Sequence, residues 1–466
     1  APRGATDEPG PARRAGPSAL SGAWSQAFYG GASKALTQLK DTPLEGQVPQ
    51  IISESTLSGI DQKQLASSAD LNWRDRSDSR ELRASFRDSH TYELMADRPS
   101  RNRLTAAYVD WRELPTGWQA RAGRQSGLGG GVLGRFDGLQ LSRSVGPQWK
   151  LGAVAGQPTD DLLDARRWFA GVSVEAEARD ERPGGSLYAI QQQIDGEVDR
   201  RALGLDLRWF SGSNSIFSQL EYDLQLRGVN VAALQATRTL DSGTTFNLMG
   251  DYRAVPLLML GNALFFPDPA ITPMPRTLTE LLRYRSLAEL RGMVGATTAY
   301  AKQALAGVTH PLDEHWQLGA DLRLTSVGAI APVPGVLPQG LPASGRLWST
   351  SAQVIGSNLY SARDTHVFSL TLLKAPTYRG WVWSYNHLSE PWPRLQLEPS
   401  LRIYGQNGPS NVNTLRWSPG MRLAWRGGEK WSIEGEVSAE RSKTTGPAQN
   451  EHVNRIFYYL GYRLEL

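Results

Sequence analysis

Apolar and polar residues alternate with a period of two through most of this chain, and this feature constrains its fold most. Residues 203–209 read LGLDLRW, and residues 81–89, 216–227, 316–325, 394–403 and 431–440 repeat the pattern. Successive side chains of a β-strand point to opposite faces, so each run predicts a strand with one apolar and one polar face. A helical period would place the charges among the apolar side chains. Such runs, separated by turn residues, follow one another from about residue 60 to the end, which predicts an all-β protein.

The composition excludes a helical membrane protein. The mean hydropathy is −0.39 and 21% of the 466 residues are charged, and no run approaches the ~20 apolar residues that a spanning helix needs. A transmembrane β-barrel is compatible with this hydropathy, because only every second residue of its strands faces lipid. Cysteine is absent, which excludes a disulfide framework and thiolate chemistry.

Two further features favour a transmembrane barrel over a soluble β-sandwich or propeller, which also shows alternation. Aromatic residues on the apolar faces lie next to turns, as expected for side chains at the two membrane interfaces. The connections also alternate roughly between short turns and longer loops, as they do in outer-membrane barrels. The aromatic residues are Trp118, Trp149, Trp209, Trp316 and Trp431.

The last twelve residues, RIFYYLGYRLEL, form the clearest single strand. Ile456, Tyr458, Leu460, Tyr462, Leu464 and Leu466 occupy one face. This strand resembles the closing strand of bacterial outer-membrane β-barrels, although that family usually ends in Phe or Trp and this chain ends in Leu466. The resemblance implies location in the bacterial outer membrane, contact with its lipid and lipopolysaccharide, and recognition of the last strand by the barrel-assembly machinery.

We expect an up-and-down antiparallel barrel of about 20 strands, with 16 to 22 admissible because bacterial barrels have an even number. The barrel is assigned to residues 51–466, and residues 50–60 are a candidate extra first strand. Residues 1–50 are interpreted as a periplasmic segment, with a Pro-rich linker over residues 1–17 and a short helix over residues 21–40. Trp24 and Phe28 lie on one side of that helix and are candidate plug residues for the lumen.

Two irregular stretches interrupt the alternation. Residues 123–138 read GRQSGLGGGVLGRFDG, which indicates either a glycine-kinked pair of strands or a loop folded into the lumen. In the second case Arg124, Arg135 and Asp137 lie at its edge. Residues 254–295 contain a Pro-rich half, 266–275, and a helix-like half, 277–292, whose leucines indicate that it packs against something. The Pro-rich loop 331–343 is its expected neighbour.

The lumen is the candidate functional site, because the polar faces of the strands carry charges of both signs. These charges either line a solute path or form a cross-strand network that stiffens the wall. Balanced charge does not select one ion sign and suits a polar, uncharged solute such as a sugar chain. The predicted lumen residues on the strands are Arg83, Arg87, Arg121, Asp206, Arg208, Glu221, Asp223, Arg227, Asp321, Arg323, Arg394, Glu398, Arg402, Glu434 and Glu436.

Other classes of function find little support. The six histidines show no metal-binding or catalytic spacing and no G-x-S-x-G motif is present, so we expect no cofactor, no metal and no enzymatic activity. The 50 basic and 46 acidic residues are interleaved, which argues against nucleic-acid binding.

Three functions remain open: a porin for polar solutes, an exporter of a secreted polysaccharide, and a plugged barrel that serves as a scaffold or receptor. The Pro/Arg-rich lead before the barrel is similar in architecture to the exopolysaccharide-export family, in which periplasmic tetratricopeptide repeats precede a C-terminal barrel. That resemblance implies periplasmic secretion partners.

Overall fold

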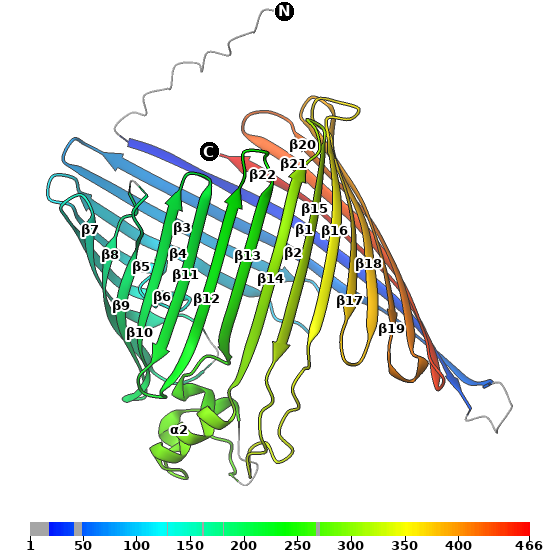
Figure 1. Ribbon diagram of the computed structural model, residues 1–466, viewed down its shortest axis with the longest axis horizontal. Helices are drawn as coiled ribbons and strands as arrows, with labels where there is room; N and C mark the ends of the chain where they lie inside the picture. The colour runs from blue at the N-terminus through cyan, green and yellow to red at the C-terminus, as the bar shows by residue number, and fades with distance from the viewer. Residues whose placement is uncertain (1–17, 42–48, 128, 161–162, 180, 267–270) are drawn as a thin grey trace, which may run out of the picture.

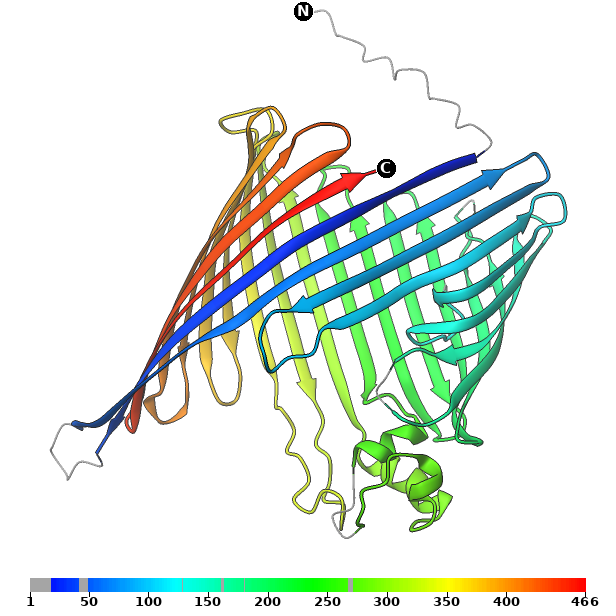
Figure 2. The ribbon, with the colours of Figure 1, turned by 180° about the vertical axis from the view of Figure 1, so that it is seen from behind.

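The computed structural model shows one closed antiparallel β-barrel of 22 strands (Figures 1 and 2). It describes residues 18–41, 49–127, 129–160, 163–179, 181–266 and 271–466. Each strand pairs with its neighbours in sequence, and β1 (Ser18–Lys40) pairs with β22 (Gln449–Glu465) from Ala23 opposite Glu465 to Leu39 opposite Gln449. This last pairing closes the sheet, so the barrel has no free edge. The expected all-β barrel is confirmed, and 22 strands is the upper end of the expected range.

The remaining strands follow in order around the wall. They are β2 (Ile51–Arg76), β3 (Arg80–Glu93), β4 (Arg101–Glu113), β5 (Trp118–Ser126), β6 (Arg135–Val145), β7 (Trp149–Pro158), β8 (Arg167–Ala176), β9 (Gly184–Ile194), β10 (Glu197–Ser211), β11 (Asn214–Asp223), β12 (Gly228–Thr239), β13 (Thr245–Val255), β14 (Ala299–Pro311), β15 (Trp316–Val327), β16 (Leu347–Ser357), β17 (Thr365–Lys374), β18 (Arg379–Trp392), β19 (Leu395–Asn407), β20 (Asn413–Arg426) and β21 (Trp431–Thr445).

The expected N-terminal helix is wrong, because residues 18–40 form the wall strand β1. Trp24, Phe28 and Ala32 are spaced by four residues, a spacing that satisfies both a helical face and one face of a strand. The register places Trp24 opposite Leu464 and Phe28 opposite Leu460 on the apolar face of β22. Both aromatic rings also contact tyrosines of β22, so they belong to the outer wall, and the plug that we expected from them is wrong. The expected domain boundary at residue 50 therefore falls inside the barrel, and the linker over residues 1–17 lies outside the described residues.

The two ends of the barrel differ in their connections. At the terminal end, where β1 begins and β22 ends, short turns join successive strands, such as residues 146–148 and 212–213. At the opposite end, here called the loop end, lie the connections 127–134, 256–298 and 328–346. The expected alternation of short and long connections holds only in part, because loop-end connections such as 195–196, 375–378 and 446–448 are as short as the terminal-end turns.

Apolar side chains on the outer face form a band between two rows of aromatic residues. Trp149 near the terminal end pairs with Ala176, which lies eight residues along β8 from the exposed Trp168 near the loop end. Eight residues correspond to about 26 Å along a strand, or roughly 20 Å of height at a tilt of about 40°, of the order of the ~25 Å apolar band of outer-membrane barrels. The outer face is therefore built to contact lipid.

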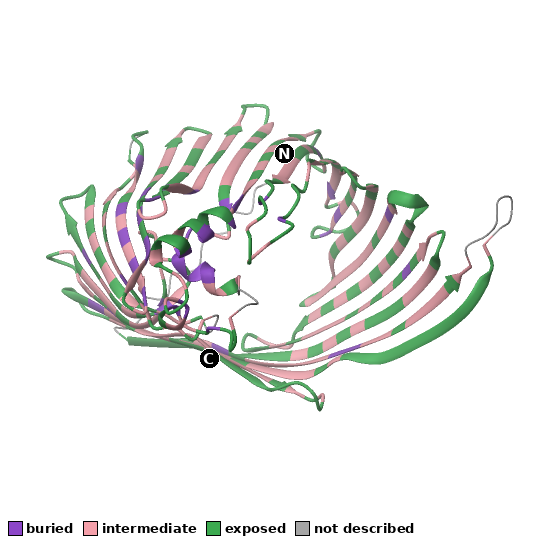
Figure 3. Cartoon of the chain, turned by 90° about the horizontal axis from the view of Figure 1, so that it is seen from below, coloured by how far each residue is buried: buried purple, intermediate pink, exposed green. Residues whose placement is uncertain are grey.

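The connection between β13 and β14, here called the insert (residues 256–298), carries the helical elements η1 (Leu260–Phe265), α1 (Leu278–Leu281) and α2 (Leu287–Ala296). Viewed from the loop end, these helices lie inside the outline of the barrel and over one half of it (Figure 3). No described helix is both long and apolar enough to cross a membrane.

The insert has a hydrophobic core of its own. Leu278, Leu290 and Val294 are fully buried and pack against Ile194 of the barrel wall. Val336, from the connection between β15 and β16, packs against the same core. The expectations that the leucines of this stretch pack against something, and that the Pro-rich loop 331–343 is their neighbour, are confirmed.

Candidate functional site

Two segments cover one half of the barrel, one against its inner wall and the other over its mouth at the loop end (Figures 1 and 2). The first is the connection between β5 and β6, here called the glycine loop (residues 127–134), and the second is the insert. Val132 of the glycine loop packs against a buried cluster on the inner wall that includes Phe136, Phe169 and Tyr188. A Cβ added at Gly131 would lie 2.3 Å from the Tyr188 ring, and Gly131 has a φ of +74°, so only glycine fits there. The loop is therefore folded into the lumen, as one of the two sequence interpretations proposed.

A buried polar network fixes the glycine loop to the wall. Arg200 and Glu221 form an ion pair, and Arg200 Nη1 also donates to the carbonyl oxygen of Gly131 at 2.9 Å. Tyr188 and Asn230 donate to the Glu221 carboxylate at 2.9 and 2.8 Å. The four wall residues are no more than 3% exposed. Because every strong donor and acceptor is used, this network acts as a rigid anchor.

Side chains of the same wall region also accept hydrogen bonds from backbone N–H groups of the insert. Asp199 accepts from the N–H of Gly261 at 2.7 Å, and Asn230 accepts from the N–H of Leu258 at 2.8 Å. Asp195 accepts from the N–H of Leu278 at 2.8 Å. A register shift between Val198 and Arg200 marks a bulge at Asp199. A bulge lets two successive side chains serve the same face, which explains how Asp199 and Arg200 both act inside the barrel.

We call the inner faces of β6–β13, which these two segments overlie, the covered half. A cavity of about 580 Å³ remains there, between the glycine loop and the wall. Its inward lining includes Gly129, Gly130, Gln140, Lys150, Ser173, Glu175, Ser186, Asp206, Arg208 and Gln219.

The inner faces of β16–β22 and β1 form the open half, where a cavity of about 810 Å³ lies against the wall. Small hydroxyl side chains follow one another from strand to strand in this region. Ser369 bonds Ser384 at 2.6 Å, and Thr371 bonds Ser351 at 3.1 Å. We call this surface the hydroxyl band; its members are Ser351, Ser369, Thr371, Ser384, Ser400, Ser418 and Ser438.

Aromatic rings border the hydroxyl band on β22 and β1. The Tyr29 ring lies 5.5 Å from Tyr459 and 6.4 Å from Phe457, and these three residues occupy inward positions. Arg422 pairs with Glu398 at 2.8 Å and with Glu434 at 2.6 Å beside them. The open half thus offers hydroxyls, ring faces and paired charges to anything inside the barrel.

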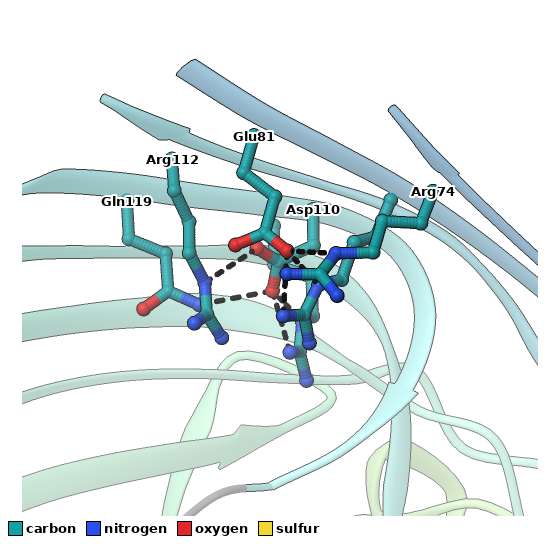
Figure 4. Close-up of polar contacts among 7 residues, drawn as sticks. Arg74, Glu81, Asp110, Arg112 and Gln119 are labelled. Atoms are coloured by element: carbon teal, nitrogen blue, oxygen red, sulfur yellow. Dashed lines mark hydrogen bonds and ion pairs between the residues drawn. The ribbon is translucent and has the colours of Figure 1, made fainter. Parts of the chain in front are cut away.

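A second charged group, here called the arginine cluster, lies on the inner wall of β2–β5 near the terminal end (Figure 4). Glu81 accepts from Arg74 at 2.5 Å and from Arg83 at 2.8 Å. Asp110 accepts from Arg121 at 2.8 Å and from Gln119 at 2.9 Å. Arg112 completes the cluster at 3.2 Å from Asp110. Four guanidinium groups share two carboxylates, so the cluster keeps an excess of positive charge.

Most of the predicted lumen residues do lie on inward rows, but their surroundings differ. Glu221 and Asp223 are buried in the covered half, where Asp223 accepts backbone N–H groups of residues 201, 225 and 226. The other inward residues are Arg83, Arg87, Arg121, Asp206, Arg208, Asp321, Arg323, Glu398, Arg402, Glu434 and Glu436.

Five predicted positions are wrong. Arg227 and Arg394 lie in connections with φ of +54° and +71°, outside the strands. Arg124 pairs with Asp137 at 2.6 Å, and the register places both on the row of the exposed Leu139. Arg135 lies on that row too. These three residues therefore face outward and do not lie at the edge of a loop that narrows the lumen.

The anchoring residues Tyr188, Arg200 and Asn230 were not predicted from the sequence. Arg200 follows a bulge and Asn230 sits at another register shift, and a bulge reverses the parity on which the sequence interpretation relied. The hydroxyl band was also missed, because serine inside an alternating run carries no signal of its own. Among the described residues, no group of three or more His, Asp or Glu side chains is arranged to hold a metal ion.

Comparisons with known proteins show the fold and little else. No family model and no curated protein matches the chain. A mutant of the ferric enterobactin receptor PfeA of Pseudomonas aeruginosa is 10% identical, with 96% of this chain and 80% of that chain covered and a TM-score of 0.50.

Two further solved structures are similar. OccK1 (OpdK) of Pseudomonas aeruginosa is 9% identical, with coverage of 96% and 99% and a TM-score of 0.41. A BenF-like porin from Pseudomonas fluorescens Pf-5 is 11% identical, with coverage of 95% and 99% and a TM-score of 0.39. What the chain shares with the receptor is the fold, a large closed β-barrel.

Proposed function

We propose that this chain is an outer-membrane channel through which polar, uncharged solutes pass along the open half of the lumen. The apolar outer band with its two aromatic rows supports insertion into a bilayer. The hydroxyl band carries the proposal, because hydroxyls on successive strands can exchange hydrogen bonds with a moving solute and hold no part of it tightly. The role is passage and not catalysis.

A carbohydrate is the solute class that the open half fits best. The stacked rings of Tyr29, Phe457 and Tyr459 offer apolar faces beside hydroxyls, which matches the alternating apolar and hydroxyl surfaces of a sugar. The arginine cluster has excess positive charge, whereas Arg422 is shared by two glutamates. The opposite signs of these two groups argue against selection for one ion sign. The proposal covers transport in either direction, including export of a secreted polysaccharide.

The insert and the glycine loop favour a second candidate, a plugged barrel that acts as a receptor. The glycine loop packs inside the covered half and the insert covers its mouth through buried contacts, and barrels of 22 strands commonly have a filled lumen. In this alternative a partner on the loop side binds to the insert.

Single-channel recording in planar bilayers separates the two candidates. The channel proposal expects steady open steps from the whole chain and transient block by maltooligosaccharides. A whole chain that stays silent would contradict the channel and favour the receptor.

Two neighbouring tyrosines provide a matched pair for the sugar path. Tyr459 lies on the inward row and Tyr458 on the outward row of the same strand. Tyr459→Ala should shorten oligosaccharide block about twofold to twelvefold, because a ring contact contributes roughly 0.5–1.5 kcal/mol. Tyr458→Ala should leave the block unchanged. Equal effects from both variants would contradict a sugar path on this side of the lumen.

A further inference from the structure

The outer face of β14–β18 lacks acidic residues near the loop end. Between residues 299 and 389, the only Asp and Glu residues are Asp313, Glu314, Asp321 and Asp364. Three of them lie in terminal-end turns, and Asp321 lies on the inward row opposite Gly307. The outward rows of these strands near the loop end therefore offer no carboxylate to a cation.

Four exposed cations nevertheless gather on this surface, which we call the outer basic patch: Lys302, Arg346, Lys374 and Arg379. Lys302 lies on β14, with its ammonium 5.8 Å from the centre of the Tyr252 ring. Lys302, Arg346 and Trp348 line one groove of about 580 Å³. Lys374 pairs in register with Trp348 on one side and with Arg379 on the other. The four cations thus adjoin one another along the aromatic row of the loop end.

The direct pairing of Lys374 with Arg379 has an energetic cost. Side chains at directly paired positions have Cβ atoms about 5 Å apart, and like charges there are destabilising. Within the described part of the chain, neither residue has an ion pair with a carboxylate. On the inner wall, by contrast, Arg87 and Arg422 do have carboxylate partners. An external anion between Lys374 and Arg379 would relieve their repulsion.

We propose that the outer basic patch binds a phosphorylated glycolipid of the outer leaflet, namely the phosphate-bearing headgroup of lipopolysaccharide. The inference rests on the proposed function, an outer-membrane channel, with the loop end at the cell surface because the longer connections of such barrels are extracellular. Apolar rows continue below the patch through the exposed Leu322, Leu370 and Leu372, so acyl chains can lie against the wall while the headgroup contacts the cations.

The arrangement of the cations fits a headgroup with two separated phosphates. Lys302 and Arg346 lie on β14 and just before β16, and Lys374 and Arg379 lie on β17 and β18. The centres of these two pairs are about two and a half strands apart, or roughly 12 Å. A single phosphate reaches one pair, whereas a bis-phosphorylated disaccharide spans both.

The test is native mass spectrometry of the full chain in detergent, titrated with bis-phosphorylated lipid A. The variant Lys374→Gln/Arg379→Gln should bind lipid A about thirtyfold more weakly, because each cation contributes about 1 kcal/mol to binding of an anionic headgroup. The matched control is Arg143→Gln/Arg238→Gln, which removes two cations from outward rows near the terminal end. The control should bind lipid A as the unaltered chain does.

Three outcomes would overturn the proposal: equal affinity for dephosphorylated lipid A, equal affinity for phosphatidylglycerol, or an equal loss in the control variant. The swap Lys374→Arg/Arg379→Lys keeps both charges and should restore binding if the first variant folds poorly. Lipid binding is measured without conduction, so a silent channel that binds lipid A contradicts the proposed function and leaves the patch supported. An open channel that does not bind lipid A supports the proposed function and contradicts the lipid site.

Discussion

In the covered half of the lumen Arg200 is fully buried with Glu221, whereas in the open half the side chain of Arg422 remains 37% exposed beside Glu398 and Glu434. Both sites pair an arginine with glutamate. They differ in what the arginine N–H groups outside the ion pair contact. Arg200 binds the glycine loop, while Arg422 still faces the lumen. Burial, more than composition, therefore separates a structural ion pair in a barrel wall from one that a solute can meet.

Removal of the two arginines gives the largest expected difference between the halves. Arg200→Met leaves the buried Glu221 carboxylate without its cation, which should lower the free energy of unfolding by about 3–5 kcal/mol. Arg422→Met should cost about 0–1 kcal/mol, because its pairs are partly exposed. Urea unfolding of the barrel in lipid vesicles, followed by tryptophan fluorescence, measures both. Similar costs for the two variants would contradict the division into halves.

Truncation in the core of the insert tests whether the covered half is closed by packing. Leu290→Ala removes a fully buried side chain and should weaken packing of the insert by about 2–5 kcal/mol. The insert should then become sensitive to trypsin at Arg283, Arg285 and Arg291 while the barrel stays intact. Tyr284→Ala, at a side chain that is 56% exposed, is the control and should not change the cleavage rate. Cleavage at equal rates would show that the core does not hold the insert.

Two adjacent glycines test the contact between the glycine loop and Tyr188. Gly131 and Gly130 have similar φ values of +74° and +66°, but a Cβ at Gly130 would meet only Ser173, at 3.8 Å. Alanine therefore strains the backbone equally at both positions. Gly131→Ala should cost a further 1–3 kcal/mol or so, because it also forces the loop away from Tyr188. Unfolding measurements on the two variants isolate that contact, and equal stabilities would mean that the loop does not rest on the ring.

Acid should loosen the N-terminal caps of α1 and α2 in the insert, and this is the smallest expected effect. The backbone N–H of Arg276 donates to Glu280 at 2.8 Å, and that of Ser286 donates to Glu289 at 2.7 Å. These bonds hold the pKa of each carboxyl below its ordinary value. A lowered pKa in the folded state stabilises the caps above the ordinary glutamate pKa of about 4.3. That contribution is lost as the pH falls through the folded-state pKa values.

Hydrogen exchange measures this loosening of the helix caps directly. Amide protection in α1 and α2 should fall as the pH drops below about 4.3, after correction for the intrinsic pH dependence of exchange. Glu280→Gln/Glu289→Gln should remove most of that pH dependence. Retained pH dependence in the double variant would assign the effect to other groups.

The sequence was sufficient for the fold wherever alternation was regular. Strands such as residues 203–209 and 431–440 were recognised because one face meets lipid and the other meets water. Residues 21–40 were misassigned because Trp24, Phe28 and Ala32 fit a helix and a strand equally well. The pairings with β2 and β22 decide between them, and the second of these joins opposite ends of the chain.

The candidate site was less predictable, because its parts are defined by contacts distant in sequence. The inward position of Arg422's partners Glu398 and Glu434 followed from parity. The role of Arg200 did not, because it depends on a bulge and on a glycine loop 69 residues away. Arg124 and Asp137 were placed in the lumen from their position beside a glycine-rich run, whereas the register directs them outward.

The chain has no cysteine, so single introduced cysteines test the central claim most directly. Ser400→Cys lies in the hydroxyl band, and Gln192→Cys lies in the covered half at a side chain that is 7% exposed. Each variant is recorded as single channels in planar bilayers while a cationic methanethiosulfonate reagent is added. The account predicts a stepwise fall in conductance for Ser400→Cys and no change for Gln192→Cys. A fall for Gln192→Cys alone would contradict it, because solutes would then pass through the half that the insert and the glycine loop are said to close.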